Sequence, residues 1–591
     1  LNFISFFGRF DLYNVDSLDF MESKQPQQLR KFYKADDDPP WPLAVLFGFQ
    51  QVMVCVSALL VIPFILADEV CPGRDVNFLR VRLISSTFVS SGIVKFSTIV
   101  QTTVGMRLAL LQGTAFAYVP SVHAFMTLPE YKCTATDVDF VPREDYEHKM
   151  ALIQGCLLLS ACVPMLIGAT GLVGMLTKFI GPITVSPLIL LLMISSVRLC
   201  VERIEKHWVS LIQAVTLFAT ILYFAEVKVP LPGIKNRRFH WYRSAIFGGY
   251  PYLIAMLFSW GFCWFLTLTN LIAPDSEART DKNTTMMAIR DASWIRVPYP
   301  GQFGPPQFNM GLFVAFLVSA LTSVFESVGD YHAIARVSDE RAPPSHAINR
   351  GILAEGSGSF ISGLIGPGVG LTTHTENIGV IGVTRVASRL TLVIAGVILI
   401  LLGIFTKVGA LLSTIPVPLV GGVLATSMAM VGGVAIANVQ SVDLKCSRNM
   451  AILGFSIMIG ILVPTYYERH PDITVTSIDT LDQIIKVLMN LPMFVGAFTA
   501  CILDNTVPGA TREQRGLRPR GAHHDLGPDG RDIYLLPKPL MKLIDKFATT
   551  EIGGRCIPLM PIIPSNKKSA RIHASPSDVS VLPRVPPEAQ L

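Results

Sequence analysis

The feature that most constrains this chain is a repeated pattern of long apolar runs between Leu43 and Cys501. A hydrocarbon core about 30 Å thick requires roughly 20 apolar residues per crossing helix. Hydrophobic residues make up 51% of the chain and charged residues only 16%, whereas an ordinary soluble protein is about one quarter charged. We therefore predict an all-α polytopic membrane protein embedded in a lipid bilayer. The predicted segments number about fourteen and cover residues 43–67, 82–101, 111–127, 150–171, 180–199, 207–227, 244–270, 310–334, 351–366, 376–387, 389–405, 416–439, 450–465 and 484–502.

Two of these segments, the third and the tenth, are too interrupted by Gly and Pro to cross the membrane as plain helices. The third lies around Gln101 to Tyr118 and the tenth around Gly366 to Ala387. Because they are seven segments apart, they take equivalent positions in two inverted seven-segment repeats, roughly residues 41–240 and 241–510. Interrupted spans in corresponding places indicate short extended stretches and a binding site near the membrane midplane.

Basic residues in short connections predict the orientation, because such loops stay on the cytoplasmic side. The connections 228–243 and 336–350 are rich in Lys and Arg, so we expect both to be cytoplasmic. The loop 198–206 is an exception, since it carries Arg198, Arg203 and Lys206 on the outer side of the same topology. Acidic neighbours do little to excuse it, because they count weakly in this rule.

Both ends of the chain are predicted to be cytoplasmic. Residues 1–40 are polar and are expected to be disordered, with Met21 as a candidate start, and residues 511–591 form a Pro-rich, basic tail. The connections 128–148 and 271–309 then face outward, and the second contains Asn283 in an N-glycosylation triplet. Of the ten Cys residues, only Cys71 and Cys133 fall in outer loops. They form either a disulfide or, like the others, small packing positions.

Three acidic residues lie in or beside otherwise apolar segments, where a carboxylate costs several kcal/mol and marks a functional candidate. Glu326 is near the end of the eighth segment, with Asp330 one helical turn further on the same face. Glu355 lies in the ninth segment. Glu376 opens the tenth, after a Gly-rich run that leaves backbone N–H groups free to meet a ligand.

The alternative interpretation of these acids is structural: they cap helices or pair with Arg350 or Arg385. His374 is more simply a hydrogen-bonded structural residue, because no His-Glu-x-x-His motif or Cys/His cluster lies near it. We therefore predict no metal and no cofactor. Four amides, which either bond between helices or contribute to the site, are Gln50, Gln51, Gln101 and Gln112.

Several function classes are disfavoured by composition. The 49 basic and 43 acidic residues give a net charge of +6 that is spread along the chain, which argues against nucleic-acid binding. No ATP-binding motif and no catalytic constellation is visible, so we predict a transporter and not an enzyme or receptor. An anion exchanger, a channel and an inactive relative of a transporter stay open as alternatives.

The segment from Glu376 to Arg385 resembles the signature of the nucleobase-ascorbate transporter family, which is Gln, Glu or Pro, then Asn, any residue, Gly, four residues, Thr, and commonly Arg or Lys. The matching positions are Asn377, Gly379, Thr384 and Arg385. The similarity extends over residues 41–510, and its last part resembles the animal branch, which includes sodium-dependent vitamin C transporters. The supporting stretches are 326–331, 346–351, 101–103, 112–114 and 503–509.

The resemblance implies fourteen segments arranged as a core domain and a gate domain, often in a homodimer. It implies that substrate lies between the third and tenth segments. Carried over by position, Glu326 and Glu376 bind substrate, and Asp330 and Glu355 tune the site or couple ions. The remaining implied substrate-site residues are Asn377, Gln112, Gly113 and Thr114. One departure stands out: the family commonly has Gln-His in the first segment, whereas this chain has Gln50-Gln51.

The substrate class depends on the first signature position, where Pro resembles ascorbate carriers and Gln or Glu resembles nucleobase carriers. Here it is Glu376. A carboxylate accepts hydrogen bonds from the ring N–H groups of uracil or xanthine. It would repel the ascorbate anion by roughly 4 kcal/mol at 4 Å and an effective dielectric constant of 20. We expect import of nucleobases across the plasma membrane by symport with Na⁺ or H⁺, with sodium-dependent ascorbate transport as the alternative.

Overall fold

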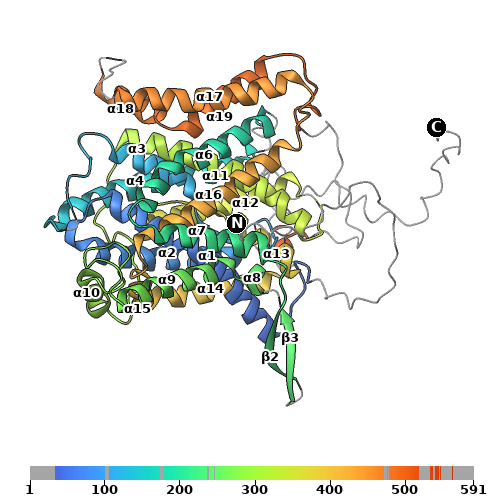
Figure 1. Ribbon diagram of the computed structural model, residues 1–591. Coiled ribbons are helices and arrows are strands. Elements are labelled where there is room, and N and C mark those ends of the chain that lie inside the picture. Colours follow the sequence, from blue (N-terminus) through green and yellow to red (C-terminus); the bar gives the residue numbers. More distant parts are fainter. Residues whose placement is uncertain are drawn as a thin grey trace, which may run out of the picture. The chain divides into compact units, whose positions relative to one another are not determined.

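The computed structural model describes residues 33–546 and 562, apart from 100–104, 137, 174–178, 236–237, 245, 342, 471–475, 477, 518–532, 537–539, 543 and 545. Gln101, one of the predicted amides, lies outside the described residues. Figure 1 shows the order of the elements along the chain, which is almost entirely helical.

In the described part of the first half of the chain, long helices and short helical turns surround one short strand, and a hairpin follows them (Figure 1). The elements are α1 (Trp41–Glu69), η1 (Gly73–Asp75), α2 (Val76–Ile99), β1 (Gln112–Thr114), η3 (Phe116–Tyr118), α3 (Val119–Met126), α4 (Arg143–Thr170), α6 (Pro182–Ile204), α7 (Val209–Phe218), the π-helical turn η4 (Ala219–Tyr223), β2 (Val229–Lys235) and β3 (Arg238–Ser244).

The second half repeats this pattern of long helices around one short strand. Its elements are α8 (Ile246–Gly249), α9 (Pro251–Leu268), α10 (Asn283–Asp291), α11 (Met310–Val337), α12 (Ser345–Ile365), β4 (Leu371–Thr373), α13 (Thr375–Thr384), α14 (Arg389–Ile404), α15 (Thr406–Leu412), α16 (Val417–Val439), α17 (Ser447–Arg469), α18 (Asp479–Met489) and α19 (Pro492–Thr506).

Local sequence explains where the helices around the central breaks begin and end. Asn309 caps α11 by accepting a hydrogen bond from the backbone N–H of Leu312 at 3.2 Å. Gly366 ends α12 in the left-handed region, at φ 86°, a conformation that glycine adopts without steric cost. The chain therefore leaves α12 abruptly and enters the extended run that leads to β4.

The described residues form a polytopic membrane protein. Seven of the helices are long and apolar enough to cross a bilayer, and the number rises to nine if the bent pairs α14–α15 and α18–α19 each count as one span. The other predicted segments are helical but are too short or too polar to be counted as membrane-crossing helices. Helix α2 carries Arg80 and Arg82, and α12 carries Arg350 and Glu355 among many Gly and Ser residues. Helices α3 and α13 and the helix formed by α7 with η4 (Val209–Tyr223) are shorter than 18 residues.

Helix packing repeats between the two halves, as the prediction of two seven-segment repeats requires. Helix α4 packs along α12, and the equivalent helix α14 packs along α2. The pairs α7–α9 and α17–α19, and likewise α1–α3 and α11–α13, are related in the same way. Most packing lies within two groups, α1–α4 with α11–α14 and α6–α9 with α16–α19. We call the first group the core and the second the gate.

Two segments differ from their expected conformation. The connection 228–243, expected as a loop, contains the β2–β3 hairpin, which extends away from the helices (Figure 1). Residues 33–40, expected to be disordered, are held by the turn after α13. The N–H of Tyr33 donates to the carbonyl of Arg385 at 3.1 Å, and Asp36 pairs with Arg389 at 2.7 Å. These partners are remote in sequence, so local composition did not reveal them.

Candidate functional site

The two interrupted segments meet in a short antiparallel pair of strands, β1 and β4, which we call the strand crossing. Gln112 lies opposite Thr373, Gly113 opposite Thr372, and Thr114 opposite Leu371. Beyond the strands, the N–H groups of Ala115 and His374 donate to the carbonyls of Gly370 and Leu111, each at 2.9 Å. Extended backbone inside a membrane must satisfy its polar groups within the protein, and this pairing does so. The predicted extended stretches in the third and tenth segments are thereby confirmed.

A half-length helix follows each strand of the crossing. Helix α3 continues from β1 through η3, and α13 begins two residues after β4. The first N–H groups of a helix have no partner within it and carry the positive end of the helix dipole. Glu376 is the second residue of α13 and is half-buried, so its carboxylate lies at that positive end.

Glu355 of α12 is buried and accepts hydrogen bonds from three hydroxyl groups. Tyr331 of α11 and Thr373 of β4 donate to its Oε1 at 2.7 and 2.6 Å, and Ser327 of α11 donates to its Oε2. Ser327 also lies 3.0 Å from the hydroxyl of Thr372. We call these three donors and the carboxylate the Glu355 cage. It ties α11, α12 and β4 together around one buried carboxylate, which such donors stabilise.

His374 fills the space above β1. A Cβ added at Gly113 would lie only 2.0 Å from Nε2 of His374, so no larger residue fits there without moving the ring. The Nδ1 of His374 is 3.4 Å from Oε2 of Glu376. The imidazole therefore bridges the strand crossing and the start of α13, consistent with its interpretation as a structural residue.

Asn377 is hydrogen-bonded to Gln51, the residue at which this chain departs from the family pattern. Its Nδ2 donates to Oε1 of Gln51 at 2.6 Å and to the backbone carbonyl of Gln51 at 2.9 Å. Gln50 points elsewhere, since its Nε2 donates to the carbonyl of Gly249 at 3.1 Å. Gln51 therefore positions the signature asparagine, and Gln50 joins α1 to the end of α8.

Several polar atoms around the crossing have no hydrogen-bond partner among the described residues. Gln112 is fully buried and lies next to the Glu355 carboxylate, but neither Oε1 nor Nε2 of its amide makes a well-aligned hydrogen bond among the described residues. Buried polar atoms are nearly always hydrogen-bonded, so such a group indicates a position that a ligand can satisfy. The other atoms of this kind are Thr114 Oγ1, His374 Nε2 and Asn377 Oδ1. On the gate, the buried hydroxyls of Tyr252 and Ser427 lie next to each other.

Glu326 lies at the boundary between core and gate. It borders a very small gap with Ile189 of α6 and Val431 of α16. Glu326 is close enough to Glu376 and Glu355 for their charges to interact, and Tyr252 of α9 is likewise close to Glu376. Asp330, one turn further along α11, is buried. No group of three His, Cys, Asp or Glu side chains within the described residues is arranged to hold a metal ion.

The end of the signature lies away from the crossing. Arg385 ends α13 at φ 59° and is exposed, and a helix of 10 residues places it about 15 Å from the start of α13. Thr384 donates to the carbonyl of Val380 at 2.9 Å, within its own helix. A Cβ at Gly379 would meet nothing within 4 Å. Glu376 and Asn377 are thus the signature residues nearest to the crossing.

Sequence reasoning missed the donors of the Glu355 cage and Tyr252. Ser327 and Tyr331 flank Asp330 and stand four residues apart, so they share one face of α11. That spacing was visible in the sequence. Thr373 and Tyr252 gave no such signal, because their relation to the acids depends on contacts between remote segments.

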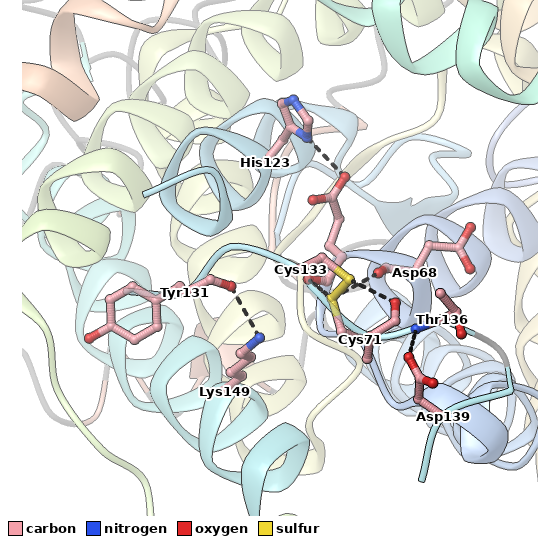
Figure 2. The surroundings of a disulfide bond; sticks show 10 residues. Asp68, Cys71, His123, Tyr131, Cys133, Thr136, Asp139 and Lys149 are labelled. Carbon is pink, nitrogen blue, oxygen red and sulfur yellow. Dashed lines mark hydrogen bonds and ion pairs between the residues drawn. A yellow bond between two sulfur atoms is a disulfide. The ribbon is translucent and has the colours of Figure 1, made fainter. Parts of the chain in front are cut away.

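The end of the bundle at which α1 finishes carries the disulfide between Cys71 and Cys133, whose Cα atoms are 5.6 Å apart (Figure 2). Beside it, Lys149 donates to the carbonyl of Tyr131 at 3.1 Å and Asp139 accepts from the N–H of Thr136 at 2.7 Å (Figure 2). That hydrogen bond lowers the pKa of the exposed Asp139. Asn283 is exposed as the first residue of α10.

Comparison with known proteins shows the following similarities. A model described as Permease family matches residues 43–469. Solute carrier family 23 member 2 of Homo sapiens is 37% identical over 572 residues, covering 93% of this chain and 85% of that protein. Solute carrier family 23 member 1 of Rattus norvegicus is 37% identical over 501 residues, covering 82% of each chain. Nucleobase-ascorbate transporter 11 of Arabidopsis thaliana is 27% identical over 583 residues, covering 90% of this chain and 77% of that protein.

Proposed function

The chain belongs to solute carrier family 23, the nucleobase-ascorbate transporters, and on that premise we propose that it imports nucleobases of the uracil or xanthine type by ion-coupled symport. Membership makes it a membrane transporter with a small-molecule substrate. The substrate class and the coupling are the parts proposed here.

The observation that carries the nucleobase proposal is the buried amide of Gln112 at the strand crossing, next to the carboxylate of Glu355. An amide offers one acceptor and two N–H donors, and apart from the neighbouring Glu355 carboxylate no described residue is placed to form a well-aligned hydrogen bond with it. The edge of uracil or xanthine presents N–H groups next to carbonyls, which is the complementary pattern. Glu376 then accepts from a second ring N–H at the start of α13, as a carboxylate does in a charge-assisted hydrogen bond.

Charge favours the same class. Glu326 and Glu376 are near one another, with Glu355 also within electrostatic reach of Glu326. An anion placed beside such a group of carboxylates is repelled, whereas a neutral base is not. A proton or Na⁺ bound with the substrate offsets part of the remaining negative charge.

Ascorbate is the second candidate, because a specific observation favours it. The identity to solute carrier family 23 members 1 and 2 is 37%, against 27% to the plant nucleobase-ascorbate transporter 11. Ascorbate transport would require a cation to neutralise Glu376 or a binding mode that avoids it.

The Glu355 cage is the proposed place of ion coupling. A carboxylate surrounded by three hydroxyl groups offers oxygen ligands to Na⁺ and can also bind a proton. The hydroxyls belong to α11 and β4, so a change in the charge at Glu355 is felt by both elements that line the substrate position. Asp330 is the second candidate for this role.

We propose an orientation with the disulfide end outside and the termini in the cytoplasm of a plasma-membrane protein. Disulfides persist in oxidising compartments. Helix α1 has 29 residues and is about 44 Å long, so residues 33–40 lie across the membrane from Cys71. Substrate then enters at the disulfide end and leaves after the core moves relative to the gate. Assembly as a homodimer and glycosylation at Asn283 belong to the same proposal.

Uptake measurements test this function. The chain is expressed in cells that lack nucleobase and ascorbate uptake, and the initial rates for radiolabelled uracil, xanthine and ascorbate are measured with and without Na⁺ and at two pH values. We expect saturable uptake of a base that depends on one of the two ions. Saturable uptake of ascorbate without base uptake would contradict the proposed substrate, and substrate-gated chloride current without uptake would support the exchanger alternative.

A further inference from the structure

A cavity of about 430 Å³ lies at the disulfide end, between the ends of core and gate helices. Its walls include Asp68 at the end of α1, Arg80 on α2, Arg203 at the end of α6 and Val417 at the start of α16. Loops on the same side add the disulfide and part of the connection before α10. None of the candidate substrate residues lines it, so in this structure the cavity and the strand crossing are separate.

Asp68 is bonded to both groups of helices in the wall of this cavity. Its Oδ1 accepts from Nη2 of Arg80 at 2.6 Å, within the core. Its Oδ2 accepts from Nη2 of Arg203 at 3.4 Å, and Arg203 belongs to the gate. The pair formed by Asp68 and Arg203 therefore crosses the boundary along which core and gate must separate.

Arg203 is fixed to the gate. Its side chain is 4% exposed, and its Nη1 donates to the carbonyl of Leu199 in the same helix at 3.0 Å. Helix α16 packs so closely that a Cβ at Gly421 would lie 2.8 Å from Cβ of Arg203. Arg203 consequently moves with α6 and α16, and any displacement of the gate from the core changes its distance to Asp68.

Arg80 makes this contact reversible. When Arg203 moves away, Asp68 keeps the bond to Arg80, so its half-buried carboxylate is not left without a partner. Arg203, near the cavity, gains access to water at the same moment. A contact with this asymmetry can break and form again during each cycle.

The same contact explains the exception to the positive-inside pattern. The loop 198–206 carries basic residues on the proposed outer side, where the rule disfavours them. Two of them are paired: Arg203 with Asp68, and Arg198 with both Glu202 and Glu468. Arg203 is thus retained on this side as a partner of a half-buried carboxylate.

We propose that the ion pair between Asp68 and Arg203 is the latch that keeps the passage from the disulfide side closed, and that it must break for substrate to reach the strand crossing from that side. The proposal rests on the proposed function only in assigning α1 and α6 to parts that move relative to one another. It does not depend on which substrate is carried.

Thiol labelling in the full chain tests the latch. The reporter is Gly329→Cys, because Gly329 borders the closed gap beside Glu326 and an added Cβ meets nothing within 4 Å. A membrane-impermeant maleimide is applied from outside to cells, and the labelling rate is corrected with the chain that lacks the reporter. We expect Arg203→Gln and Asp68→Asn each to raise the rate at least fivefold.

Two matched variants separate a latch from general loosening. If the residues act on each other, the double variant Asp68→Asn, Arg203→Gln labels no faster than the faster single variant. Arg80→Gln, which leaves the pair between core and gate in place, should not raise the rate. Surface biotinylation verifies that each variant reaches the membrane. If Arg203→Gln does not reach it, Arg203→Lys, which keeps the charge on a shorter side chain, is used in its place.

The latch would be overturned by labelling rates within twofold of the parent for an Arg203 variant that reaches the cell surface, or by multiplied effects in the double variant. Because labelling requires no substrate, these outcomes are independent of the proposed function. A chain that takes up bases with unchanged labelling contradicts the latch alone. A chain that takes up no base but labels faster in both single variants contradicts the proposed function alone.

Discussion

The Nδ2 of Asn377 is 2.6 Å from Oε1 of Gln51, and this contact joins α13, which begins at the strand crossing, to α1. Both side chains are buried. The signature asparagine is therefore oriented by the first segment, and its Oδ1 has no partner among the described residues.

Gln51→Ala should raise the KM for substrate by a larger factor than the factor by which it lowers the amount of protein at the cell surface. The substitution leaves the buried Nδ2 of Asn377 with only the backbone carbonyl of Gln51, and an unsatisfied buried donor costs about 1–3 kcal/mol. Concentration dependence of uptake measures the effect. Gln51→His, which restores an acceptor, should recover part of it. An unchanged KM in Gln51→Ala would show that this contact does not orient Asn377.

Tyr331→Phe should weaken ion dependence without removing substrate recognition. It deletes one of the three hydroxyl donors to Glu355, and a hydrogen bond to a charged group contributes about 1.5–3 kcal/mol. We expect the Na⁺ or H⁺ concentration for half-maximal uptake to change by at least tenfold, and Glu355→Gln to abolish the dependence. The control is Tyr466→Phe on the exposed surface of α17. Equal ion dependence in Tyr331→Phe and the parent would exclude the Glu355 cage from coupling.

Gly113→Ala should disable the protein by steric conflict at the crossing. The added Cβ would lie 2.0 Å from Nε2 of His374, and overpacking of this kind costs roughly 1–3 kcal/mol or displaces the ring. Uptake and detergent-extracted thermal stability should both fall, and the double variant with His374→Ala should recover stability. Gly454→Ala, where an added Cβ meets nothing within 4 Å, is the matched control. Stability equal to that of the control would mean that the ring can move aside freely.

Removing the disulfide should lower thermal stability. Cys71 and Cys133 are 62 residues apart, and closing a loop of that length restricts the unfolded chain by about 4 kcal/mol in the chain-entropy description. Cys71→Ser, Cys133→Ser and the double variant should therefore lose stability equally, whereas Cys446→Ser should not. If the loss of stability in the double variant equalled the sum of the losses in the two single variants, a bond between Cys71 and Cys133 would be contradicted.

The sequence predicted the breaks in the fold better than the contacts across them. The Gly-rich run from Gly366 to Thr375 cannot continue a helix, and this local property was enough to locate β4 and the start of α13. The partner of β4, by contrast, is β1, more than 250 residues earlier in the chain. Only the equivalence of the two repeats pointed to that pairing.

The acids of the candidate site were visible because a carboxylate in an apolar segment is unusual. Their partners were not, since Thr373 reaches Glu355 through a strand and Gln51 reaches Asn377 from another segment. Arg203 was conspicuous only as an exception to a charge rule. Its role depends on Asp68, 135 residues away, which no local pattern connects to it.

The most direct test of the proposed substrate readout is the ratio of xanthine to ascorbate uptake in the unmutated protein and in Glu376→Pro. Proline is tolerated in the first turn of a helix, where its missing N–H has no partner within the helix, so the variant should keep α13. We predict a ratio above one in the unmutated protein and a fall of at least tenfold in the variant, as loss of one charge-assisted hydrogen bond of about 1.5–3 kcal/mol implies. A ratio below one in the unmutated protein, or an unchanged ratio in the variant, would contradict the account.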